Sequence, residues 1–187
     1  MTPARLRLTV VLSGVLVAGL ALLAWTQTWF DLVLDGAQSL AVTGQQAAPA
    51  LSALGLASLA LMGALSIAGR GVRVALGILE TAIGVAIAWV AVGALAAPVA
   101  ASAPTITETT AVSGPESIAA LVTSVAVGPW PGVAIAAGVL TALVGIAVLA
   151  TGHRWPGPTR KYEATPSDDS GTPVGAWDRL SDGSDPT

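Results

Sequence analysis

The sequence predicts an all-α membrane protein: a bundle of four transmembrane helices, with a small cap on one side and a disordered tail on the other. Hydrophobic residues make up 53% of the 187-residue chain and charged residues only 10%. A soluble domain carries roughly 25% charged residues. The hydrophobic residues are also gathered into four blocks, and a helix that spans a bilayer needs about 20 of them in a row.

The four blocks place the spans at about residues 6–25, 51–68, 72–97 and 131–151. Arg5 and Arg7 before the first block would also suit a cleaved signal peptide. The long apolar core and the missing small-x-small cleavage site favour an uncleaved span. We therefore expect a membrane domain over residues 1–151.

The basic residues predict the orientation of this domain. All eight lie near the N-terminus, between the second and third spans, or after the fourth span, and the connections 26–50 and 98–130 contain none. Cytoplasmic loops are enriched in Lys and Arg. We therefore expect a multi-pass protein of the bacterial plasma membrane with both termini in the cytoplasm. Tryptophans favour membrane interfaces, and we expect Trp25, Trp29 and Trp130 at the outer interface and Trp155 at the inner one. For Trp130 and Trp155 we expect a role as anchors and nothing more.

The two basic-free connections predict an extracytoplasmic cap. "TWFDLVLDGAQSLAVTG" has two β-prone runs around Asp35-Gly36, which favours a β-hairpin. "TITETTAV" alternates Thr with other residues and suggests a further strand. "SGPESIAALVTSVAV" favours a short interfacial helix, with one apolar face made of Ile118, Leu121, Val122 and Val125.

Residues 152–187 are rich in Pro, Gly, Ser and Asp, which predicts a disordered cytoplasmic tail. Trp177 and Leu180 are three residues apart and would share one helical face. This pair favours a short docking helix for a cytoplasmic protein. The alternative is that Trp177 rests on the inner membrane surface.

The end of the chain also carries a family resemblance. Trp177 to Thr187 follows the pattern W-D-x-L-S-x-G-x-D-P-T, which resembles the C-terminus of the tryptophan-associated transmembrane proteins of actinobacteria. The segment "VTGQQAAPAL", the pair Trp25 and Trp29, and the four spans agree with it. The resemblance implies a gene beside tryptophan-biosynthesis genes. It assigns no biochemical role and supplies no catalytic residues.

Glu80 is the one acidic residue inside an expected span. A charge at a helix centre costs about 2.5–3.5 kcal/mol, and each Val, Leu or Ile returns about 0.3–0.6 kcal/mol, so the third span should still insert. Glu80 lies on a stripe of small residues, where membrane helices approach closely, so it should point into the bundle. Ser13, Ser66 and Thr141 are its candidate polar neighbours. Glu80 is then either a packed structural acid or a coupling site for a proton or substrate.

The composition argues against most other functions. There is no Cys, which excludes disulfides and thiolate chemistry, and a single His disfavours a metal site. No Ser-His-Asp set and no phosphate-binding Gly loop occurs. We expect no catalytic residue, metal or cofactor, and no enzyme activity. A net charge of −3 does not favour nucleic acid.

The leading hypothesis is an integral membrane accessory or interaction protein associated with tryptophan biosynthesis. Its partners would be the lipid bilayer and a cytoplasmic protein bound through the tail. The alternative is a small homo-oligomeric transporter of tryptophan or an aromatic precursor, with Glu80 as the coupling site.

Overall fold

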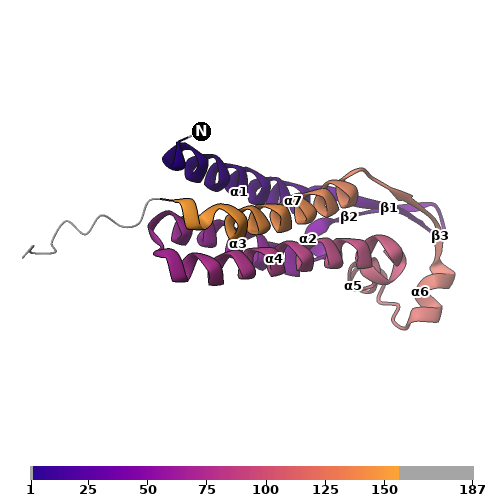
Figure 1. The fold of residues 1–187 in the computed structure, drawn as a ribbon. Coiled ribbons are helices and arrows are strands. Elements are labelled where there is room, and N and C mark those ends of the chain that lie inside the picture. The colour runs from indigo at the N-terminus through magenta and orange to yellow at the C-terminus, as the bar shows by residue number, and fades with distance from the viewer. Residues whose placement is uncertain (1, 156–187) are drawn as a thin grey trace, which may run out of the picture.

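The computed structural model describes residues 2–155. Figure 1 shows four long helices side by side, and each is long and apolar enough to cross a membrane. They are α1 (Pro3–Thr26), α3 (Ala50–Ile67), α4 (Arg70–Ala96) and α7 (Trp130–Thr151). The predicted four-helix architecture is confirmed, and the expected spans differ from these bounds by at most three residues at either end.

The bundle has two unlike ends. The start of α1, the connection between α3 and α4, and the end of α7 lie together at one end (Figure 1). We call it the basic end, after Arg5, Arg7, Arg70 and Arg73. The 3₁₀ helix η1 (Gly152–Arg154) follows α7 there. The cap lies at the opposite end and contains β1 (Thr28–Leu34), β2 (Gln38–Thr43), β3 (Val122–Val127), α2 (Gly44–Ala47), α5 (Pro98–Thr110) and α6 (Pro115–Leu121).

The cap is built on a three-stranded antiparallel sheet with the order β2-β1-β3. The predicted hairpin is present, and its turn lies between Leu34 and Gln38. Gly36 (φ +82°) and Ala37 (φ +64°) adopt left-handed conformations there. The Asp35 carboxylate accepts a hydrogen bond from the Gly36 N–H at 3.0 Å, which fixes this tight turn.

The second half of the cap differs from the prediction. "TITETTAV" was expected to form a strand, but residues up to Thr110 belong to helix α5. The Ser102, Thr109 and Thr110 hydroxyls each donate to the carbonyl four residues earlier, so the alternating threonines are accommodated in a helix. The expected helix after Pro115 ends at Leu121, and Val122 and Val125 lie in β3, paired with β1.

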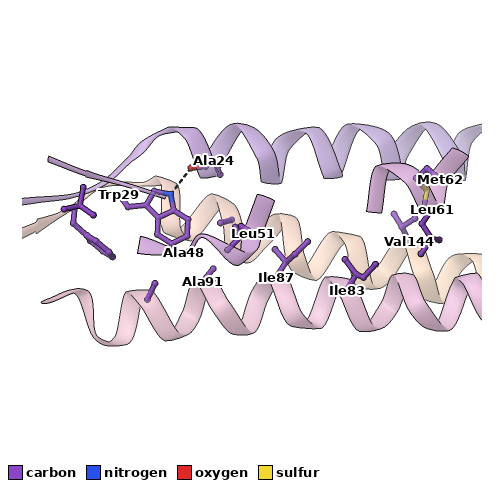
Figure 2. Packing of buried hydrophobic residues seen from close by; sticks show 14 of the residues in the cluster. Ala24, Trp29, Ala48, Leu51, Leu61, Met62, Ile83, Ile87, Ala91 and Val144 are labelled. Carbon is purple, nitrogen blue, oxygen red and sulfur yellow. Dashed lines mark hydrogen bonds between the residues drawn. The ribbon is translucent and has the colours of Figure 1, made fainter. Parts of the chain in front are cut away.

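Trp29 joins the sheet to the bundle. Its indole N–H donates to the Ala24 carbonyl at the end of α1, at 2.8 Å (Figure 2). Its ring meets Phe30 edge to face, with the centroids 6.3 Å apart. Trp29 is 0% exposed, so its ring packs inside the protein. It is a core residue that fixes where the cap begins.

Candidate functional site

Glu80 lies in the interior of the bundle. It is 0% exposed, although it stands in the middle of a membrane-spanning helix. The predicted inward orientation is therefore confirmed. The buried face of α4 on which it lies also includes the small or apolar residues Gly77, Ile83, Gly84 and Ile87.

A serine from the neighbouring helix holds the Glu80 carboxyl group. The Ser58 hydroxyl on α3 donates to Glu80 Oε1 at 2.7 Å, and Ser58 is itself 0% exposed. A hydrogen bond of this kind between two spans satisfies polar groups that lipid cannot solvate. It also ties α3 to α4 at mid-helix, away from the connection that joins them in the chain.

The predicted polar neighbours occupy other places. The Ser13 hydroxyl donates to the Val10 carbonyl at 2.8 Å, and that of Ser66 donates to the Gly63 carbonyl at 2.6 Å. Neither hydroxyl donates to Glu80, so the expectation that Ser13 and Ser66 are its hydrogen-bonding neighbours is wrong. Thr141 is buried on α7, as expected.

Two further polar atoms are buried in this region of the bundle. Within residues 2–155, Glu80 Oε2 and Thr141 Oγ1 are inaccessible to solvent and have no hydrogen-bond partner. A protonated carboxyl group offers one donor, and a hydroxyl offers a donor and acceptors. The arrangement therefore retains unused hydrogen-bonding capacity on Glu80 and on α7.

The close packing of α4 against α7 fixes the position of Glu80. A β-carbon at Gly84 would overlap the backbone of Ala142, and one at Gly145 would overlap Thr81. The two helices therefore meet with their backbones almost in contact, as the stripe of small residues around Glu80 predicted. This contact lies beside Glu80 on α4.

The structure also contains two apolar pockets that Glu80 does not line. One of about 740 Å³ lies between α5 and α6 in the cap, with Pro98, Pro104 and Ile118 among its lining residues. Another of about 340 Å³ lies along the contact between α4 and α7, with Gly84, Ala142 and Trp89 among its lining residues, and Trp89 is 79% exposed. Glu80, Ser58 and Thr141 line neither pocket.

The remaining chemistry-bearing residues do not extend this site. His153 is exposed in η1 at the basic end, far along α7 from Thr141. No group of three or more His, Cys, Asp or Glu side chains that could hold a metal occurs among residues 2–155. The predicted docking pair, Trp177 and Leu180, lies outside the described residues.

Comparison with known proteins gives one match. A family model described as "tryptophan-associated transmembrane protein" matches residues 7–187, nearly the whole chain. No curated protein and no solved structure matches the chain.

Proposed function

The chain belongs to the family of tryptophan-associated transmembrane proteins, and from this premise we propose that it is a non-enzymatic accessory protein that serves tryptophan biosynthesis by binding a protein partner at the membrane. The bundle acts as an anchor. The tail after residue 155 binds the partner in the cytoplasm, close to the inner face of the plasma membrane.

The observation that carries this proposal is the close contact of α4 with α7 beside Glu80. Spans α4 and α7 meet at Gly84 and Ala142 without room for a side chain between them. Glu80 is fully buried and hydrogen-bonded to Ser58. An intramembrane acid usually marks a transport or relay pathway. This acid is instead hydrogen-bonded between α3 and α4, which suits an anchor better than a transporter.

The proposed orientation rests on charge. The four described arginines that define the basic end lie together there, and the described cap contains Asp31, Asp35, Glu108 and Glu116 without any Lys or Arg. Positive residues remain on the cytoplasmic side during insertion. This distribution supports a cytoplasmic basic end, and a tail on that side would have access to soluble biosynthetic enzymes.

The test is co-purification of the full chain in a mild detergent. Wild type should retain an enzyme of tryptophan biosynthesis, and Trp177→Ala/Leu180→Ala should retain at least tenfold less of it. Truncation of an aromatic anchor of an interface typically has an effect of this size or larger. The matched control is Tyr162→Ala/Val174→Ala, which removes one aromatic and one aliphatic side chain from the same tail.

Two results would contradict the proposal. One is equal recovery of the enzyme with both double variants, which would remove the role of Trp177 and Leu180. The other is uptake of labelled tryptophan into vesicles that depends on this protein and disappears in Glu80→Gln, which would favour a transporter.

A further inference from the structure

The basic end contains a pocket of about 310 Å³ between the start of α4 and the end of α7. Arg70 and His153 line it and are exposed to solvent. Val74, Val148 and Leu149 form its apolar wall on the side of the spans. The pocket is therefore amphipathic, with cationic and ionisable groups at one level and aliphatic groups below them.

Arg73 also lines this pocket and holds a positive charge in a fixed position there. Its Nη1 donates to the carbonyls of Gly152 and Trp155, both at 3.3 Å. Its guanidinium carbon lies 5.5 Å from the centre of the Trp155 ring, a cation–π distance. Trp155, which was expected to be an interfacial anchor, is only 3% exposed beneath it. The Arg73 guanidinium is therefore already fixed in position before any ligand binds.

Like charges accumulate at this end. Arg7 on α1 and Arg70 on α4 are both close enough to Arg73 to repel it. The five acidic residues in the described part of the chain lie elsewhere, four in the cap and Glu80 inside the bundle. An anion bound at Arg70 would relieve this repulsion, because a nearby opposite charge stabilises each cation.

The depth of the pocket indicates what kind of anion reaches it. Helix α4 has 27 residues, about 40 Å at about 1.5 Å per residue. The hydrocarbon core is about 30 Å thick, and the polar headgroups extend the bilayer to about 40–45 Å. Arg70, the first residue of α4, therefore lies at the level of the headgroup phosphates, and the aliphatic wall below it lies at the level of the acyl chains.

From this arrangement we propose that the pocket is a phosphate-binding site, with Arg70 and His153 as its contacting side chains and Arg73 as a fixed neighbouring charge. Its ligand is the phosphate of an anionic lipid headgroup or a free phosphate. Basic pockets between spans are a recurring site for anionic headgroups, and the aliphatic wall provides a surface for the attached acyl chain.

The test measures lipid retained by the purified full chain. Native mass spectrometry should detect bound phosphatidylglycerol after titration in a neutral detergent, with much less phosphatidylcholine. Arg70→Gln should weaken phosphatidylglycerol binding about fivefold, the effect of one cation near a membrane surface. Arg5→Gln is the matched control, because Arg5 is exposed at the same end and does not line the pocket.

His153→Gln provides a second variant on the opposite wall, and it should also weaken binding. Displacement of the lipid by millimolar inorganic phosphate would identify a free phosphate as the ligand, and lipid retained under those conditions would identify the headgroup.

Unchanged binding in both Arg70→Gln and His153→Gln would overturn the site. An equal loss in Arg5→Gln, or equal retention of phosphatidylcholine, would also overturn it by showing only a general surface effect.

Discussion

Ser58 and Glu80 form a buried hydrogen bond between two spans, and removal of the donor tests its importance. Ser58→Ala leaves Glu80 Oε1 without the hydroxyl that now lies 2.7 Å away. An unsatisfied buried polar group costs about 1–3 kcal/mol, so the free energy of unfolding should fall by about that amount. Denaturation in detergent micelles, followed by circular dichroism, would measure the change.

Ser66→Ala is the matched control on the same helix, because the Ser66 hydroxyl is exposed and bonds only to its own turn, at Gly63. It should change the stability by less than about 0.5 kcal/mol. The pair Ser58→Ala/Glu80→Leu should recover part of the lost stability, because removal of both partners leaves nothing unsatisfied. Equal stabilities of Ser58→Ala and Ser66→Ala would contradict this role for Ser58.

The inward direction of Glu80 was predictable from the sequence, but its partner was missed. The small-residue stripe on α4 gave the direction. Ser13 and Ser66 match Glu80 only in approximate depth. The α3–α4 hairpin contains a usable signal, because Ser58 and Glu80 each lie eleven residues from Gly69, between the two helices. Residues equally far from the centre of an antiparallel hairpin lie at the same depth.

At the scale of elements, the contact between α4 and α7 is the most sensitive to substitution. Gly84→Ala would place a β-carbon onto the backbone of Ala142. Overpacking of this kind typically costs about 1–3 kcal/mol, so the variant should unfold at lower denaturant. Gly93→Ala, on the same helix, meets nothing within 4 Å and should be neutral or slightly stabilising. Equal stabilities of the two variants would contradict backbone contact between α4 and α7.

The local pattern of residue types in the sequence correctly predicted the spans and the hairpin. The same kind of pattern gave wrong predictions for α5 and β3. A span is specified by its own apolar length, and the hairpin by Asp35-Gly36 at its turn. Strand β3 depends on β1, some ninety residues earlier, whose Leu32 pairs with Val125. Helix α5 depends on burial of Ile106 against the rest of the protein. Both elements are set by distant partners that periodicity does not reveal.

At the scale of the whole molecule, opposite charges lie at opposite ends. The described cations gather where α1 begins, where α3 and α4 are joined, and where α7 ends, and the cap has only acidic charge. The proposed tail partner and the basic-end phosphate site are both assigned to the cytoplasmic side on this basis. The orientation is therefore the central claim of the account.

Labelling of single cysteines tests the orientation directly, because the chain has no native Cys. Thr2 at the basic end and Thr109 in the cap are both exposed, so each can be replaced by Cys and treated with a membrane-impermeant maleimide. The account predicts that Thr109→Cys is labelled in intact cells and that Thr2→Cys is labelled only after permeabilisation. Labelling of Thr2→Cys but not of Thr109→Cys in intact cells would contradict it.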